Sequence, residues 1–225
     1  MAAAFDALIF DCDGVLLNSE QICLEAELAM LATCGVRYAK HEYIDKYMGT
    51  TEREFRAGLR TETLSRFSVE LPATFFDDLS SAIAAAYRER LAEIPDAAAA
   101  VSAWHKIKAV ASSSSKDTLL FKLRTTGLAA LFGEHIYSAD AVGVGKPDPA
   151  IFSYTAAQLG VAPERCVVVE DSVNGVLAAK RAGMTAVGFV GGGHCLPDHA
   201  ARLQAHGADL VLRTHAELAT HLRGL

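Results

Sequence analysis

The stretch IFDCDGVLLNSE, residues 9–20, places two carboxylates two positions apart between apolar segments. Burying a carboxylate is costly unless a partner compensates the charge, so Asp11 and Asp13 need an explanation. One explanation is a tight turn, because Asp and Gly favour chain reversals. The other is that a buried strand ends at Asp11 and delivers both acids to a common site. The second is favoured, since a turn does not require an apolar run before it.

Short apolar runs with the composition of doubly buried strands recur along the chain, at 5–10, 107–112, 166–170 and 185–190. Weaker runs of the same kind lie at 135–139 and 208–212. Between the runs are segments with apolar residues at helical spacing, each followed by a glycine, at 116–126, 149–159 and 172–182. Alternating strands and helices predict an α/β fold with a Rossmann-like parallel sheet covered by helices on both faces.

One region interrupts this alternation. Between residue 19 and about residue 90 the pattern contains no buried strand and favours helices at 19–34, 51–66 and 72–92. A sheet that starts at residue 5 and resumes at residue 107 has therefore received a helical insertion. We expect a core formed by residues 1–17 and 89–225 and an α-helical cap domain formed by residues 18–88.

The composition limits the class of protein. Of 225 residues, 51% are hydrophobic and 21% are charged, which is typical of a globular chain with a sizeable core. The net charge of −6 argues against a nucleic acid or an anionic membrane as partner. The first residues lack the basic start of a secretory signal, and the five cysteines show no CxxC spacing. We therefore expect free thiols and a cytoplasmic protein, either a monomer or a weak homodimer.

Polar residues follow the predicted strands at the edge where parallel sheets bind ligands. They are Asp11, Asp13, Ser112, Ser113, Glu170 and Asp171. Lys146, in the loop GVGKPDP, adds an amine to the same edge. Crowded carboxylates repel one another unless a cation lies between them, and oxygen donors favour Mg²⁺. A metal, a hydroxyl and an amine that hold phosphate, and a spare carboxylate together predict phosphoryl transfer.

These residues also occur in a familiar order. DCDGVLLNSE, residues 11–20, resembles the DxDGxLxxS signature of the haloacid dehalogenase-like superfamily of phosphatases. The strand ending at Ser112, the pair Lys146-Pro147 and the segment VVVEDSVNG with Glu170 and Asp171 follow in the order that family requires. The insertion resembles the helical cap of the sugar-phosphatase and β-phosphoglucomutase branches. The resemblance implies a Mg²⁺-dependent phosphomonoesterase that hydrolyses a small phosphorylated sugar, sugar acid or polyol.

The resemblance implies a role for each acid. Asp11 would attack phosphorus and form an aspartyl-phosphate, and Asp13 would protonate the leaving alcohol and later draw a proton from water. Asp171, Asp11 and the backbone carbonyl of Asp13 would hold the metal, with Glu170 supporting it. From the residues alone, Glu170 and Asp171 are also explained as the N-terminal cap of a helix.

The remaining site residues would hold phosphate and substrate. By the resemblance, Lys146 would neutralise the transferring group, and Ser112 with the Ser113 amide would bind a phosphate oxygen. A lone lysine in such a loop is otherwise solvated, and Ser114 or Ser115 suits the cap of the following helix. Thr51 and Arg53 would read the leaving group, although the same residues suit an ordinary helix start.

Three histidines follow the last strong strand, in GGGHCLPDHAARLQAHG. The spacing of His194, His199 and His206 matches no compact set of histidine ligands, so we expect surface residues.

Two alternative functions remain open at this point. A β-phosphoglucomutase-like mutase would carry a histidine on the first cap helix, but residues 21–25 read QICLE and the first histidine is His41. A non-enzymatic phospho-acceptor or binding protein of the same fold would need neither the helical insertion nor the second acid, Asp13. Simple hydrolysis is therefore the favoured prediction.

Overall fold

A computed structural model describes residues 5–48 and 52–224 of the chain. The chain forms two compact units, Met1–Asn18 with Leu91–Leu225 and Ser19–Arg90. The divisions thus fall after residues 18 and 90, where the sequence predicted them after 17 and 88.

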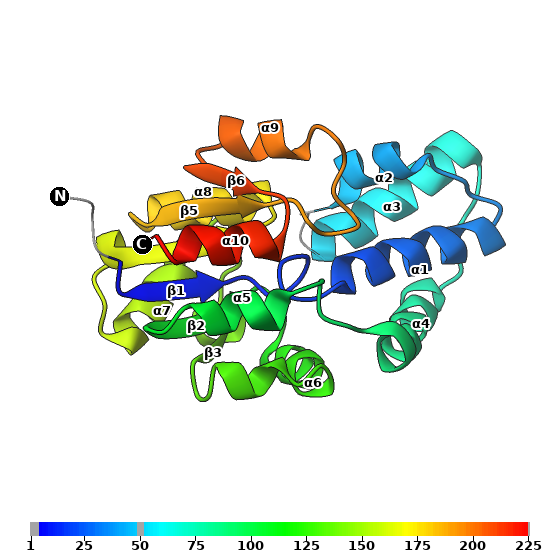
Figure 1. Ribbon diagram of the computed structural model, residues 1–225. Helices are drawn as coiled ribbons and strands as arrows, with labels where there is room; N and C mark the ends of the chain where they lie inside the picture. Colours follow the sequence, from blue (N-terminus) through cyan, green and yellow to red (C-terminus); the bar gives the residue numbers. More distant parts are fainter. Residues whose placement is uncertain (1–4, 49–51, 225) are drawn as a thin grey trace. The chain divides into compact units, whose positions relative to one another are not determined.

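The larger unit contains a parallel sheet of six strands in the order β3-β2-β1-β4-β5-β6 (Figure 1). The strands are β1 (Ala7–Phe10), β2 (Ile107–Ser112), β3 (Ile136–Ser138), β4 (Cys166–Glu170), β5 (Thr185–Phe189) and β6 (Leu210–Leu212). Every predicted strand is present. Phe10, the last residue of β1, lies beside Val110 of β2 and Val169 of β4, and these two strands end within two residues of that level. This register brings the segments after these strands to one edge of the sheet.

Side chains of the central strand alternate between two apolar layers, as the two-residue period of a strand requires. Leu8 and Phe10 belong to one buried cluster, and Ala7 and Ile9 belong to the other. All four are fully buried, because helices cover both faces. This explains why the strand reads as a continuous apolar run rather than as an alternating one.

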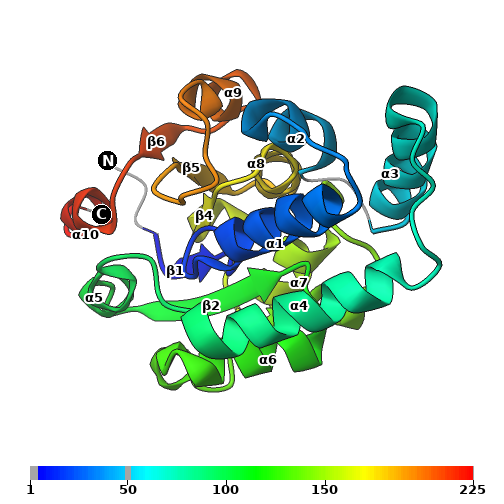
Figure 2. The same cartoon turned by 90° about the vertical axis from the view of Figure 1, so that its right-hand side faces the viewer.

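Three helices contribute to each layer (Figure 2). The cluster with Leu8 and Phe10 contains residues of α5 (Ala97–Ala103), α6 (Lys116–Thr125) and α10 (His215–Leu222). The cluster with Ala7 and Ile9 contains residues of α7 (Ala150–Leu159), α8 (Val173–Arg181) and α9 (His199–Ala205). Short 3₁₀ turns lie at Leu128–Leu131, Ala139–Ala141 and Pro163–Arg165. The sequence predicted α6, α7 and α8. It did not predict α9 and α10, because their helical patterns of apolar residues are weaker.

The second unit consists of four described helices: α1 (Ser19–Thr33), α2 (Lys40–Tyr47), α3 (Glu52–Phe67) and α4 (Phe75–Arg90). α1 packs on α4, where Cys23 Sγ lies 3.0 Å from Tyr87 Oη and Arg90 donates to Glu25 at 2.7 Å. α2 and α3 share a set of edge-to-face aromatic contacts that includes Tyr47 with Phe55. The predicted helices are present, and α2 is an additional one.

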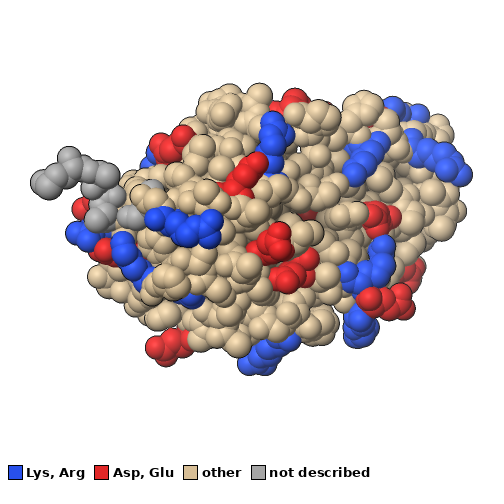
Figure 3. Space-filling model, in the orientation of Figure 1, with Lys and Arg blue, Asp and Glu red and all other residues tan. Residues whose placement is uncertain are grey.

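Two properties concern the kinds of partner that the protein could bind: the charges on its surface and the apolarity of its helices. On the face drawn in Figure 3, cationic and anionic side chains are interspersed. In the part of the chain that the structure describes, no helix has the length and apolarity needed to cross a bilayer.

Candidate active site

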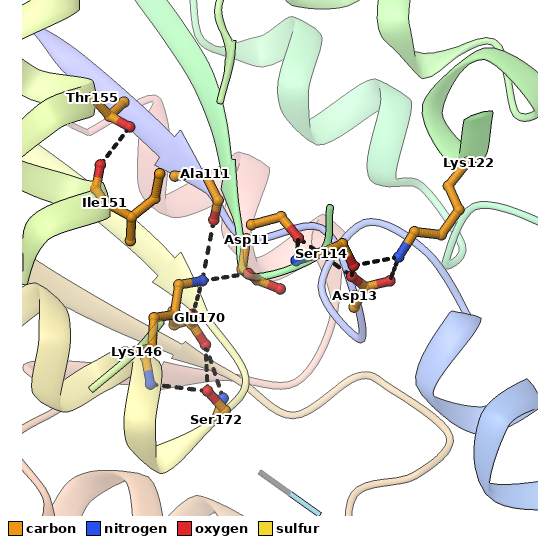
Figure 4. A network of polar contacts seen from close by, with 12 residues as sticks. Asp11, Asp13, Ala111, Ser114, Lys122, Lys146, Ile151, Thr155, Glu170 and Ser172 are labelled. Carbon is orange, nitrogen blue, oxygen red and sulfur yellow. Dashed lines mark hydrogen bonds and ion pairs between the residues drawn. The ribbon is translucent and has the colours of Figure 1, made fainter. Parts of the chain in front are cut away.

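A buried lysine joins two of the predicted acids at the carboxyl edge of the sheet (Figure 4). Lys146 Nζ donates to Asp11 Oδ1 at 2.5 Å, to Glu170 Oε1 at 2.6 Å and to the carbonyl of Ala111 at 3.1 Å. Its side chain is 5% exposed, so the ammonium is held by these oxygens rather than by water. Lys146 is therefore not the solvated loop residue that its local sequence also allowed.

Asp11 continues the ladder of β1 beyond the strand. Its backbone N–H donates to the carbonyl of Val169 at 2.9 Å. This hydrogen bond fixes Asp11 beside β4, at the start of the loop that follows β1. The residue is 7% exposed. The first explanation considered for residues 9–20, a surface turn, is therefore wrong for Asp11.

Glu170, at the end of β4, accepts from the Lys146 ammonium and from both the amide and the hydroxyl of Ser172, each at 3.0 Å. The side chain of Ser172 caps α8 by accepting from the amide of Gly175. Because Ser172 serves as the cap, the explanation of Glu170 and Asp171 as capping residues is wrong. A Cβ at Gly175 would lie 1.8 Å from Glu170 Cδ, so only glycine lets α8 approach the carboxylate.

Asp171 lies against the loop that follows β1. A Cβ added to Gly14 would lie 1.9 Å from Asp171 Oδ2, and the φ of Gly14 is +79°. Asp171 is 5% exposed. Gly14 is thus required for two reasons. Its backbone is in the left-handed region, and a side chain there would overlap the carboxylate of Asp171.

Burial and neighbouring charges shift the pKa values of Asp11, Asp171 and Lys146. Burial raises the pKa of Asp11 well above its ordinary value, partly offset by Lys146, and the neighbouring Glu170 and Asp171 raise it further. Burial and Glu170 likewise raise the pKa of Asp171. Burial disfavours the Lys146 ammonium, but the charges of Asp11 and Glu170 raise its pKa overall. A divalent cation among these oxygens would stabilise the ionised carboxylates, and the donor set fits Mg²⁺.

Asp13 has partners that the sequence did not predict. Lys122 of α6 forms an ion pair with Asp13 Oδ1, and Ser114 Oγ donates to Asp13 Oδ2 at 2.9 Å. Lys122 Nζ also donates to Ser114 Oγ at 2.9 Å, which closes a triangle of contacts. The side chain of Lys122 is 2% exposed and that of Asp13 is 15% exposed. The position of Lys122 between Leu119 and Leu123 on the apolar face of α6 was a signal in the sequence, because a lysine there needs a buried partner.

The predicted phosphate-binding serines differ from each other. Ser112 ends β2, is 1% exposed, and its hydroxyl accepts from the amide of Ser114 at 3.1 Å and donates to Asp13 Oδ2 at 3.4 Å. Ser113 is exposed beside it. Ser115 caps α6 by accepting from the amide of Thr118. The sequence predicted either Ser114 or Ser115 for this cap.

The two residues predicted to read the substrate belong to the helical unit. Thr51 lies outside the described residues. Arg53 is exposed on the first turn of α3, in the helical unit.

The prediction of three surface histidines is wrong for His194. His194 is 4% exposed, and its Nε2 lies 2.9 Å from Asp171 Oδ2. His199 is partly buried, with Nε2 2.5 Å from the backbone oxygen of Asp171, whereas His206 is exposed as predicted. The prediction failed because spacing along the chain does not show that the loop after β5 folds back onto the end of β4.

Known proteins resemble this chain over most of its length. Residues 5–183 match the family described as "Hydrolase: haloacid dehalogenase-like hydrolase". A phosphorylated carbohydrates phosphatase of Thermotoga maritima is 34% identical over 210 residues, which are 92% of this chain and 94% of that protein. A 6-phosphogluconate phosphatase of Escherichia coli is 28% identical, over 85% of this chain and 86% of that protein. A crystal structure of a hydrolase from Deinococcus radiodurans, with bound phosphate and sodium, superposes with a TM-score of 0.87 at 38% identity, covering 99% and 96% of the chains.

Proposed function

Because the chain belongs to the haloacid dehalogenase-like hydrolase family, we propose that it is a Mg²⁺-dependent phosphomonoesterase. Its substrate would be a small phosphorylated sugar, sugar acid or polyol, hydrolysed through an aspartyl-phosphate on Asp11. The observation that carries the proposal is the buried Lys146 between Asp11 and Glu170, with Asp171 on the same edge of the sheet. An amine held between two buried carboxylates suits neutralisation of a phosphoryl group better than it suits a structural role.

Asp11, Asp171 and the backbone carbonyl of Asp13 would hold the proposed metal, and Glu170 would support the site through its contacts with Lys146 and Ser172. When bound, Mg²⁺ supplies positive charge to the phosphoryl oxygens and to the carboxylates. The oxygen donors and the raised pKa values of Asp11 and Asp171 support this assignment.

In the proposed reaction, a carboxylate oxygen of Asp11 forms a bond to phosphorus while the bond to the substrate oxygen breaks. Asp13 gives its proton to the departing alkoxide, so the product leaves as an alcohol. Asp13, now ionised, takes a proton from water, whose oxygen attacks the phosphorus of the aspartyl-phosphate. The bond to Asp11 breaks, inorganic phosphate leaves, and both aspartates return to their starting states.

Neighbouring groups hold the phosphoryl group and the reacting carboxylate. Lys146 orients Asp11 and offsets the negative charge that gathers in the transition state. The Ser112 hydroxyl and the Ser113 amide, at the end of β2, are proposed to bind a phosphate oxygen. Ser114 and Lys122 hold Asp13, which fixes the proton donor relative to the nucleophile.

The proposed substrate class rests on the relatives, whose names specify phosphorylated carbohydrates and 6-phosphogluconate. Thr51 and Arg53, in the helical unit, remain proposed contacts for the leaving group. The proposed partner is accordingly a small phosphorylated metabolite, and the expectation of a monomer or weak homodimer is open to a sizing measurement. The mutase alternative lacks support in α1, where Gln21 bonds to Glu25 at 2.9 Å and residues 21–25 include no histidine.

The test is a panel of phosphate monoesters incubated with the purified protein and Mg²⁺, with release of inorganic phosphate as the readout. We expect turnover of sugar, sugar-acid or polyol phosphates, and loss of at least about a thousandfold in kcat in Asp11→Asn. Asp117→Asn, an exposed aspartate on α6, is the matched control and should retain the parental rate. Parental turnover by a folded Asp11→Asn protein would place the nucleophile elsewhere. Conversion of a hexose 1-phosphate to its 6-phosphate without phosphate release would favour the mutase.

A further inference from the structure

The loop after β5 brings two imidazoles and a thiol together at the carboxyl edge of the sheet. The ligand atoms of His194, Cys195 and His199 lie within 4.8 Å of one another. His194 is buried, and the other two residues are partly buried. The proposed phosphatase reaction uses none of these three side chains, so the cluster needs an explanation of its own.

The spacing of these atoms is that of metal ligands. For a tetrahedral Zn²⁺ with bonds of about 2.0 Å to nitrogen and about 2.3 Å to sulfur, the two ligand atoms are about 3.5 Å apart. His194 Nε2 and Cys195 Sγ are 3.5 Å apart. All three ligand atoms lie within 4.8 Å of one another, and small side-chain rotations reduce a separation of that size to the tetrahedral one. The three groups are therefore close to a coordinating arrangement before any ion binds.

The hydrogen bonding of His199 leaves one ring nitrogen available. His199 Nε2 lies 2.5 Å from the backbone oxygen of Asp171, an acceptor only, so the ring proton is on Nε2. The other nitrogen, Nδ1, is buried and has no hydrogen-bond partner among the described residues. An imidazole that donates to a backbone carbonyl with one nitrogen and directs a lone pair from the other is the usual state of a metal ligand. Without an ion, that buried lone pair is left unsatisfied.

His194 is held in a narrow slot beside Asp171. A Cβ at Gly14 would lie 2.6 Å from His194 Cε1, and a Cβ at Gly192 would lie 2.5 Å from the same atom. The two glycines thus let the ring enter until Nε2 is 2.9 Å from Asp171 Oδ2. His194 Nε2 therefore lies between Cys195 Sγ, at 3.5 Å, and Asp171 Oδ2, at 2.9 Å.

We infer that His194, Cys195 and His199 bind a borderline divalent cation of the Zn²⁺ type. Imidazole and thiolate donors favour such an ion over Mg²⁺, which prefers oxygen. Binding releases the thiol proton of Cys195, and the ring proton of His194 moves from Nε2, which faces Asp171 Oδ2, to Nδ1, so that Nε2 can bind the ion. The site is separate from the proposed Mg²⁺ site, but His194 contacts Asp171, a proposed ligand of that site.

The contact between His194 and Asp171 predicts a functional effect, which rests on the proposed phosphatase activity. An ion held by His194, Cys195 and His199 takes His194 Nε2 from Asp171 Oδ2 and places positive charge beside that carboxylate, which weakens Mg²⁺ binding there. Occupation of the second site therefore lowers the turnover of phosphate esters. Zn²⁺ would act as an inhibitor whose potency depends on the thiol of Cys195.

Co²⁺ added to the metal-free protein tests the site without reference to activity. Coordination by a thiolate gives a near-ultraviolet charge-transfer band, and a tetrahedral site gives intense visible bands. We expect both in the parental protein, saturating at a single ion per chain. Cys195→Ser should lose the charge-transfer band, His199→Ala should lose the visible intensity, and His206→Ala, an exposed histidine of the same segment, should retain both. Absence of the band in the parental protein, or its survival in Cys195→Ser, would overturn the inference.

Phosphate release at constant Mg²⁺ with increasing Zn²⁺ tests the effect on turnover. We expect inhibition of the parental protein and of His206→Ala, and an inhibition constant raised about 10- to 100-fold in Cys195→Ser. Equal inhibition of all three proteins would show that the second site does not act on Asp171. If no phosphate ester is turned over, the proposed function fails, while the Co²⁺ spectra still decide whether the site exists.

Discussion

Lys122 and Asp13 form a buried ion pair across 109 residues of the chain. The lysine comes from the middle of α6 and the aspartate from the loop after β1, and Ser114 contacts both. The pair links a helix of the core to the proposed acid-base residue. We therefore propose that Lys122 is a positioning residue for Asp13, which it contacts directly.

Replacing Lys122 with Met keeps the aliphatic part of the side chain but leaves Asp13 without its cation. We expect kcat for sugar phosphates to fall about 10- to 100-fold, with KM changed little, because proton transfer depends on the orientation of Asp13. The first step on p-nitrophenyl phosphate should fall less, since its leaving group needs no proton. Lys122→Arg should recover part of the loss, and Lys116→Met, an exposed lysine on α6, should lose nothing.

The same variant tests stability. Breaking a buried pair by removing one partner costs up to about 3 kcal/mol, so the thermal midpoint of Lys122→Met should fall. Equal losses on both esters, scaling with the fraction unfolded, would contradict the positioning role.

Two helical glycines should respond to alanine in opposite ways. Gly175 of α8 approaches Glu170, and its new Cβ would meet the carboxylate at 1.8–2.2 Å, whereas the nearest atom to a Cβ at Gly58 of α3 is 3.6 Å away. We expect Gly175→Ala to lose about 1–3 kcal/mol and much of its activity, because Glu170 must shift away from Lys146. Gly58→Ala should gain about 0.5–1 kcal/mol from the reduced entropy of the unfolded chain. Thermal unfolding and phosphate-release assays on both variants check this prediction. A Gly175→Ala protein that is stable and active would refute the proposed steric conflict with Glu170.

Glu27 of α1 should make the stability of the protein depend on pH. Burial raises its pKa from 4.5 to about 7. Between those values the folded state keeps a proton that the unfolded state has released, so stability is higher at low pH and falls as pH rises from about 4.5 to about 7. The loss amounts to about 3 kcal/mol, and Glu27→Gln should abolish it. Thermal midpoints measured from pH 5 to pH 7.5 check this, with exposed Glu25→Gln as the control. An unchanged slope in Glu27→Gln would exclude the assignment.

Removal of Mg²⁺ should affect both activity and stability. A chelator should abolish phosphate release, and added Mg²⁺ should restore it, because the acids around Lys146 carry more negative charge than one ammonium offsets. An ion present at about 100 times its dissociation constant stabilises the folded state by about 2.7 kcal/mol, which raises the thermal midpoint by about 5–10 °C. Asp171→Asn should show no such rise. Activity that persists in chelator would refute the metal assignment.

The sequence predicted the sheet and the acidic edge because both depend on local patterns. A strand such as β4, buried on both faces, reads as an uninterrupted apolar run, and Glu170 and Asp171 follow it directly. Once parallel strands are recognised, the rule for ligand binding places the segments after them at one edge. Asp11, Ser112 and Lys146 were assigned to that edge on the same basis.

The partners within the site were decided by the tertiary structure. Lys122 reaches Asp13 because β2 lies beside β1, which turns α6 toward the loop after β1. His194 reaches Asp171 because β5 pairs with β4 and two glycines leave room for the ring. Hydrophobic periodicity records only whether a residue is buried, whereas these contacts depend on which loops meet once the strands are paired. The sequence shows a lysine at an apolar position, Lys122, and the adjacent His194 and Cys195. It does not show which residues they contact, because those contacts form only in the folded chain.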